Sequence, residues 1–141
     1  MVAMAVSPIP SLVVLMVCAL GAPGAWAGEL AARCSNATLK GTYLFHHSGI
    51  LEGQPYAESG RAVYDGKGGL VVAYQDSAGS GGTEKVTYTV SADCIGKVTY
   101  DNGQIETSFI SPDGSRFTYT MTVPPGRKPT ALSGIEVRVA P

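Results

Sequence analysis

Residues 116–123 read Arg-Phe-Thr-Tyr-Thr-Met-Thr-Val, and this stretch decides the fold because its polar and apolar side chains alternate strictly. Successive residues of a β-strand point to opposite faces, so the pattern predicts a strand with one face in the core and one in solvent. Phe117, Tyr119, Met121 and Val123 form the predicted inner face. One dry and one wet face is typical of an antiparallel sheet.

The same alternation occurs on both sides of this stretch. In residues 85–90 the apolar face is Val86, Tyr88 and Val90, and in residues 133–139 it is Ile135, Val137 and Val139, opposite Glu136 and Arg138. Turn residues separate the alternating segments at intervals of eight to twelve positions. Asn102-Gly103 is the strongest hairpin signal, because this dipeptide suits a type I′ turn.

The whole pattern predicts an all-β domain. After one helical turn within residues 34–41, the expected strands are 42–48, 57–64, 70–75, 85–90, 95–100, 104–110, 116–123 and 133–139. Eight strands joined by hairpins close most economically into a single antiparallel meander barrel, since closure removes the sheet edges. A two-sheet β-sandwich is the alternative. Barrels of this size are either filled by side chains or hold one small ligand.

The first residues of the chain read as a secretory signal peptide, residues 1–27. An apolar run at 11–20 is too short to span a bilayer, and Ala25-Trp26-Ala27 offers small residues to a signal peptidase. Cleavage between Ala27 and Gly28 would leave a barrel domain of residues 28–141 in the periplasm or outside the cell, without a membrane anchor. No Lys or Arg precedes Arg33, so the alternative is that the true start lies elsewhere.

The charge of the chain limits the partners that it can bind, and its cysteines indicate a disulfide and not a metal site. Ten basic and eleven acidic residues leave a net charge of −1, which gives no electrostatic basis for binding nucleic acid or an anionic membrane. Cys34 and Cys94 remain after cleavage, and such a pair in an oxidising compartment predicts a disulfide, with two free thiols as the alternative. Two cysteines fill at most half a zinc shell, so we expect no metal site and no cofactor.

His46 and His47 are the only histidines in the chain. In an extended strand they point to opposite faces and cannot jointly hold one metal ion. His47 shares its face with Tyr43 and Phe45, which we interpret as the inner one, and Leu44 and His46 face outward. A buried, hydrogen-bonded His47 is one interpretation, and a general base or ligand donor in a pocket is the other.

If the barrel holds a ligand, aromatic and polar inward residues would contact it. Glu58 and Arg61 lie three apart and face opposite sides, and we expect each near a barrel mouth or on the outer face. No nucleophile triad is recognisable, so no catalytic residue is assigned. The candidate pocket residues are Tyr43, Phe45, His47, Tyr88 and Tyr119.

Four segments, 34–45, 60–68, 88–96 and 133–138, resemble small secreted bacterial proteins of the allene oxide cyclase barrel-like group. This resemblance implies a calycin-like barrel with a central cavity. The plant namesakes cyclise an unstable fatty-acid epoxide, by holding a flexible substrate in a reactive shape. None of the plant enzyme's catalytic positions matches a residue of this sequence.

Three functions are consistent with these patterns. The first is an exported barrel that binds a small, largely apolar molecule in its cavity. The second is a cyclase or isomerase that acts by substrate shape in the same cavity. The third is a filled barrel that acts as an envelope component or a protein-interaction module, through the loops at 76–83 and 124–130. The volume of the cavity separates the third function from the first two.

Overall fold

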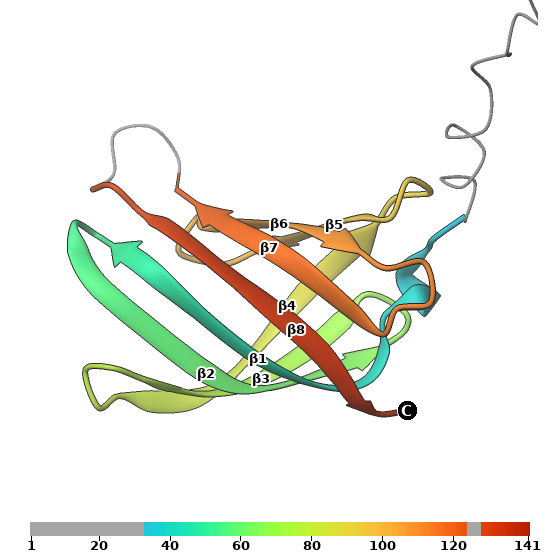
Figure 1. Cartoon of the computed structure of the whole chain (residues 1–141), viewed down its shortest axis with the longest axis horizontal. Helices are drawn as coiled ribbons and strands as arrows, with labels where there is room; N and C mark the ends of the chain where they lie inside the picture. The colour runs from blue at the N-terminus through green and yellow to red at the C-terminus, as the bar shows by residue number, and fades with distance from the viewer. Residues whose placement is uncertain (1–32, 124–127) are drawn as a thin grey trace, which may run out of the picture.

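The structure is a computed structural model that describes residues 33–123 and 128–141 (Figure 1). The predicted signal peptide, its cleavage site between Ala27 and Gly28, and part of the loop at 124–130 lie outside the described residues.

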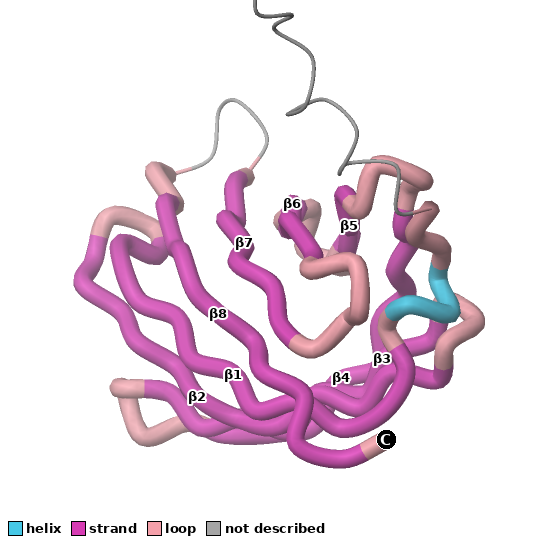
Figure 2. The backbone as a smooth tube through the Cα atoms, turned by 45° about the vertical axis from the view of Figure 1, so that its right-hand side comes forward, coloured by secondary structure: helices cyan, strands magenta, loops and turns pink. Residues whose placement is uncertain are grey.

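A 3-10 turn and eight strands follow one another along the chain. They are η2 (Asn36–Thr38), β1 (Lys40–Leu51), β2 (Gln54–Asp65), β3 (Gly69–Asp76), β4 (Gly81–Val90), β5 (Ile95–Thr99), β6 (Ile105–Ile110), β7 (Arg116–Thr122) and β8 (Ala131–Ala140). Each strand pairs antiparallel with the next, and β8 pairs with β1, so the sheet closes into a barrel (Figure 2). The predicted meander barrel is confirmed, and closure excludes the sandwich.

The first hairpin is longer than predicted. β1 and β2 stay paired as far as Leu51 and Gln54, and only Glu52 and Gly53 lie between them. Both turn residues have positive φ, 51° and 85°, as a type I′ turn requires. Residues 52–53 are Glu-Gly and not Asn-Gly, so no strong hairpin signal marks this turn, and the predicted strands end at residue 48 and begin at residue 57. The extension carries Tyr56 and Glu58 to the rim of the barrel.

The meander puts alternate turns at opposite ends of the barrel. The β1–β2, β3–β4 and β5–β6 turns lie at one end, which we call the mouth, and η2 and the C-terminus lie at the other, the closed end (Figure 1). Tyr43, Tyr64, Tyr88 and Phe117 pack against one another across the interior at the closed end, with ring centroids 5.1–6.1 Å apart. Side chains therefore fill this half of the barrel.

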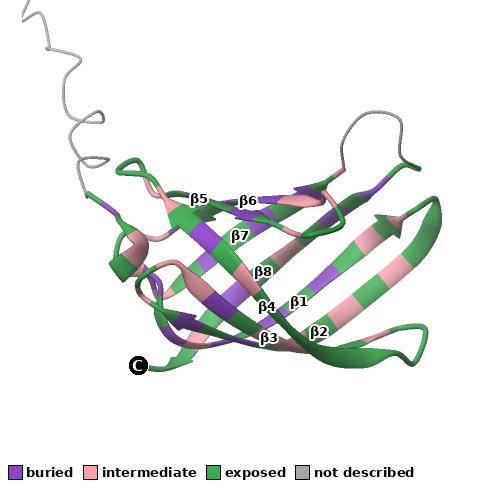
Figure 3. Ribbon diagram, turned by 180° about the vertical axis from the view of Figure 1, so that it is seen from behind, coloured by how far each residue is buried: buried purple, intermediate pink, exposed green. Residues whose placement is uncertain are grey.

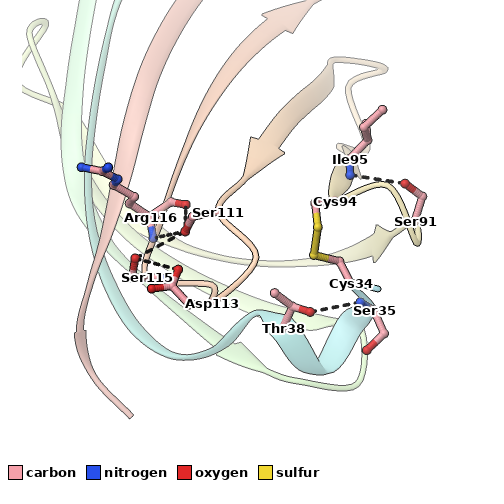
Figure 4. The surroundings of a disulfide bond; sticks show 10 residues. All are labelled: Cys34, Ser35, Thr38, Ser91, Cys94, Ile95, Ser111, Asp113, Ser115 and Arg116. Atoms are coloured by element: carbon pink, nitrogen blue, oxygen red, sulfur yellow. Dashed lines mark hydrogen bonds between the residues drawn. A yellow bond between two sulfur atoms is a disulfide. The ribbon is translucent and has the colours of Figure 1, made fainter. Parts of the chain in front are cut away.

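Cys34 and Cys94 form the predicted disulfide, with their Cα atoms 5.0 Å apart (Figure 4). It joins the segment before η2 to the turn between β4 and β5. Beside it, the Cys34 N–H donates to the Ala92 carbonyl at 3.2 Å, and the Ser35 N–H donates to the Thr38 hydroxyl at 3.0 Å. The bridge thus fastens the start of the described chain to the closed end.

The inner faces of β1, β4 and β7 are those predicted, but that of β8 is not. Glu136 is buried, whereas Ile135, Val137 and Val139 are 38 %, 44 % and 54 % exposed. Glu136 pairs with Phe45 of β1 and Phe117 of β7, and directly paired residues point to the same face. Because both phenylalanines face inward, register forces Glu136 inward. Figure 3 shows the resulting alternation of buried and exposed residues along the strands.

Candidate functional site

The mouth half of the barrel contains a cavity of about 520 Å³. Its wall combines the inward side chains of the strands with residues of the β1–β2 and β5–β6 turns. Apolar side chains, among them Leu70, Val72, Met121 and Leu132, contribute alongside aromatic and acidic ones. The interior of the barrel thus has two parts: a closed end filled with aromatic rings and a mouth half that contains the cavity.

The predicted pocket residues divide between these two parts. Phe45, His47 and Tyr119 line the cavity. Tyr43 and Tyr88 belong to the closed-end cluster, and the structure does not bring them to the cavity wall. The Tyr43 hydroxyl donates to the Gly114 carbonyl. The Tyr88 hydroxyl lies 2.9 and 2.8 Å from the carbonyls of Asn36 and Leu39, so it serves to hold η2.

His47 is buried and hydrogen-bonded, as one of the two interpretations of the strand pattern expects, and it also lines the cavity, which the other interpretation requires. Its Nδ1 lies 2.9 Å from the Tyr119 hydroxyl, and its Nε2 lies 4.0 Å from Oε1 of Glu58. Burial, helped by the charge of His46, lowers the pKa of His47 to about 4. Despite the short distance to Glu58, the imidazole is therefore neutral at neutral pH and no ion pair forms. His46 points to the outer face, as predicted.

Two glycines make room for the ring side chains of the cavity. A Cβ on Gly134 would lie 2.6 Å from the His47 Cβ and 2.7 Å from a ring carbon of Tyr119. Gly134 pairs with both residues, one on each neighbouring strand. On β2, a Cβ on Gly60 would come within 2.8 Å of the Phe45 ring. At these two positions a residue without a side chain is needed, because a Cβ would overlap with the neighbouring ring side chains.

Two buried carboxyl groups in the cavity were missed by the sequence interpretation. Glu106 and Glu136 are only 4 % and 5 % exposed, and both line the cavity. The Tyr100 hydroxyl donates to Glu106 at 3.3 Å, and the Tyr64 hydroxyl donates to Glu136 at 3.2 Å. The sequence did contain a signal for Glu106. The Ser111–Gly114 turn sets a register that pairs Glu106 with Met121. Because Met121 is predicted to point inward, its partner Glu106 should point inward as well.

Burial controls the protonation of these carboxyls. Desolvation raises the pKa of Glu106 to about 7, against the smaller opposing effect of the Tyr100 hydrogen bond. Desolvation also raises the pKa of Glu136 well above its usual range, and the nearby charge of Glu106 raises it further. The two carboxyls thus interact, and the pair resists carrying two negative charges at neutral pH.

A third carboxyl, Glu58, stands nearer the rim. It accepts a short hydrogen bond from the Tyr56 hydroxyl, and burial raises its pKa. Arg61, three residues along β2, is exposed on the outer face. The expectation that the two face opposite sides, with Glu58 near the mouth, is confirmed.

Taken together, the cavity is strongly acidic for a protein of nearly balanced charge. Seven of the eleven acidic residues line it, Glu52, Glu58, Asp76, Glu84, Asp101, Glu106 and Glu136, against one of the ten basic residues, the exposed Lys85. Within residues 33–123 and 128–141, no group of three or more His, Cys, Asp or Glu side chains is arranged to hold a metal ion.

The part of the chain that the structure describes contains no helix long and apolar enough to cross a membrane. Comparison with protein-family models and with curated proteins finds no match for this sequence. The resemblance to the allene oxide cyclase barrel-like group stays a prediction that rests on the four quoted segments.

Proposed function

We propose that this protein is an exported β-barrel that binds a small molecule in its cavity. The observation that carries the proposal is the cavity itself, whose volume of about 520 Å³ falls within the ~300–1,000 Å³ of typical ligand sites. A barrel of this size otherwise fills its interior with side chains. The aromatic cluster does so at the closed end, and the mouth half has room for a ligand.

The composition of the wall refines the expected ligand. Phe45, Leu70, Val72 and Leu132 offer apolar surface, as a largely apolar ligand needs. The Tyr119 hydroxyl, His47 and the buried carboxyls add hydrogen-bonding groups at a few fixed points. A molecule with an apolar body and one polar end fits this wall better than a plain hydrocarbon, because the polar groups would otherwise lose their water without a partner.

Two further parts of the proposal concern origin and family. A disulfide is compatible with an oxidising compartment, which supports export to the periplasm or beyond. A meander barrel with a cavity is what membership of the allene oxide cyclase barrel-like group implies, so the fold supports that proposal. Neither part is needed for the ligand-binding function.

An isomerase or cyclase in the same cavity is the second candidate function. One observation favours it: the neutral imidazole of His47 and the Glu106 carboxyl, whose pKa is about 7, line one cavity. A carboxyl that titrates near neutral pH, as Glu106 does, suits proton transfer, and the neutral imidazole of His47 beside the same space is free to accept a proton. Replacing His47 by Phe distinguishes the two functions, because ligand binding should survive the change better than turnover.

Native mass spectrometry of the protein from its producing cells, with an organic extract analysed in parallel, tests the main proposal. A reproducible excess mass that extracts as one small compound is the expected result. A bare mass, together with no binding of a hydrophobic fluorescent probe, would contradict the proposal and favour the filled-barrel function, with the loops at 76–83 and 124–130 as contacts.

A matched pair of variants places the ligand inside the barrel. Val72 lines the cavity, whereas Val71, its neighbour on β3, is exposed on the outer face. Val72→Trp should fill the cavity and abolish binding of the probe, and Val71→Trp should leave binding unchanged. Equal loss in both variants would show that the probe binds elsewhere.

A further inference from the structure

We infer that the cavity selects an organic cation, a small amine whose ammonium group is bound between Glu106 and Glu136 while the rest of the molecule lies against the aromatic wall. The inference rests on the proposed ligand-binding function and adds the chemical class of the ligand. It is argued from the hydrogen bonding of the two carboxyls, the charge of the wall and its aromatic content.

The hydrogen bonding of Glu106 and Glu136 is incomplete in a specific way. In each residue, Oε2 accepts from a tyrosine, and within the described residues Oε1 has no such donor. Yet no fully buried side-chain oxygen in that part of the chain lacks a partner. The second oxygen of each carboxyl must therefore reach the space of the cavity, so two side chains that are more than nine-tenths buried present an unpaired acceptor to a ligand.

No side chain of the described residues supplies the positive charge that these carboxyls would need. Among residues 33–123 and 128–141, the one close approach between a basic and an acidic side chain joins His47 to Glu58, and His47 is neutral there. Lys85 reaches the cavity wall only at an exposed position of β4, where it pairs with Val71, and directly paired residues point to the same, outer face. A buried carboxylate without a cation is costly, and a ligand that brings one removes the cost.

The aromatic wall favours an organic cation over a hydrated metal ion. Phe45, Tyr56, Tyr74, Tyr100 and Tyr119 line the same cavity. Faces of aromatic rings attract ammonium groups, and their area packs against an apolar body. The described residues also hold no cluster fit to coordinate a metal. Carboxyl and aromatic groups around one space are a combination that recognises amines.

Binding of an amine should release protons. At neutral pH the pair holds protons that an ammonium group displaces, since the charge of the ligand stabilises the carboxylates. Affinity should therefore rise between pH 5 and pH 8, where a primary amine stays protonated. The other titratable groups that interact with the pair or line the same cavity are Tyr64, Tyr100, Tyr119, neutral His47, Tyr56, Tyr74, Glu52, Glu58, Asp76, Glu84, Asp101 and the exposed Lys85.

Isothermal titration with three indoles that differ only in the end group tests the inference: tryptamine, tryptophol and indole-3-propionate. We expect tryptamine to bind at least tenfold tighter than tryptophol, and indole-3-propionate to bind weakest. Proton release, read from titrations in buffers of different ionisation enthalpy, should accompany tryptamine alone. Equal affinity for the amine and the alcohol, or a preference for the acid, would overturn the inference.

Variants that replace the two carboxyls by neutral amides test whether Glu106 and Glu136 cause the preference for an amine. Glu106→Gln combined with Glu136→Gln should reduce the preference for tryptamine over tryptophol to less than threefold. Asp93→Asn is the matched control, because Asp93 is exposed in the β4–β5 turn at the closed end. A preference that persists in the double variant, or is lost in the control, would overturn the inference.

The outcomes also separate this inference from the proposed function. If a hydrophobic probe enters the cavity, in a manner blocked by Val72→Trp, and none of the indoles binds, the cation inference is wrong and the ligand-binding function stands. If neither the probe nor any indole binds, both are wrong.

Discussion

Burial shifts the pKa values of His47 and Glu106 in opposite directions, because it favours the neutral form of each side chain. It lowers the pKa of His47 to about 4 and raises that of Glu106 to about 7. His47 therefore contributes its full stability above pH ~6.5 and loses it as the pH falls toward 4. Glu106 contributes fully below its ordinary pKa and loses stability as the pH rises through about 7. The cavity groups make the fold most stable under mildly acidic conditions.

The variant His47→Phe should lose less stability than the wild type between pH 7 and pH 4. Between pH 7 and pH 4 the wild-type imidazole must become charged on unfolding, which lowers the free energy of unfolding by on the order of 2–3 kcal/mol. The variant lacks this loss, although at pH 7 it forfeits the hydrogen bond to Tyr119, about 1 kcal/mol. Urea unfolding at both pH values measures the difference. The exposed His46→Gln should keep nearly the wild-type slope, because burial is the larger cause of the lowered pKa of His47 and the charge of His46 the smaller one. An unchanged slope in His47→Phe would show that His47 is not buried.

The variant Glu106→Gln should change the free energy of unfolding at alkaline pH. A neutral amide of nearly the same shape avoids the cost of ionising a buried carboxyl, so at pH 8 the variant should be more stable than the wild type by about 1 kcal/mol or more. At pH 4 the two should unfold at nearly the same urea concentration, since the wild-type carboxyl is protonated in both states. A variant that is less stable at pH 8 would mean that the carboxylate has a cationic partner inside the barrel.

At the scale of elements, the strands could be predicted from the sequence and the faces of some of them could not. Alternation in β7 placed Tyr119 and Met121 inward, and the structure agrees. In β8 the apolar set is the exposed one, because the register with Phe45 and Phe117 fixes the face. The hydrophobicity pattern of one strand predicts its inner face from that strand alone. The inner face is in fact decided by the register between paired strands, which a single strand does not reveal.

The same limit explains which site residues were missed. His47 could be found because it alternates with aromatic neighbours on one strand. Glu106 and Glu136 could not be found from their own strands, since glutamate in a strand indicates the solvent face unless a ligand or partner is known. Only the register of the β6–β7 hairpin, which pairs Glu106 with Met121, pointed to an inward Glu106. The cavity and its acidity arise from contacts between strands that are distant in sequence, so they became visible only in the closed barrel.

Gly134→Ala tests how tightly β8 packs behind the cavity. The added methyl would press on the His47 Cβ and the Tyr119 ring, 2.6 and 2.7 Å away, and neither strand backbone can move without breaking the barrel ladder. We expect a loss of about 1–3 kcal/mol in the free energy of unfolding, and weaker binding of the hydrophobic probe. Ser133→Ala, at the exposed neighbouring position, should change neither quantity. Wild-type stability in Gly134→Ala would indicate a wider spacing between the strands.

For the whole molecule, the division into a filled closed end and a hollow mouth separates stability from binding. The disulfide, η2 and the aromatic cluster all lie at the closed end, and the acidic cavity lies at the mouth. Cys34 and Cys94 close a loop of 60 residues that includes β1 to β4. Chain entropy then assigns the bridge roughly 4 kcal/mol, because it restricts the unfolded chain.

Replacing both cysteines, Cys34→Ser with Cys94→Ser, should therefore lower Tm by about 10–20 °C and leave the affinity for a cavity probe unchanged at 10 °C. The affinity should hold because neither cysteine lines the cavity, and the barrel closes through the pairing of β1 with β8. Calorimetry gives the first quantity and titration of the folded variant gives the second. If affinity falls together with Tm while circular dichroism still reports a folded barrel, the two ends are coupled through the sheet, and the cavity depends on the closed end for its shape.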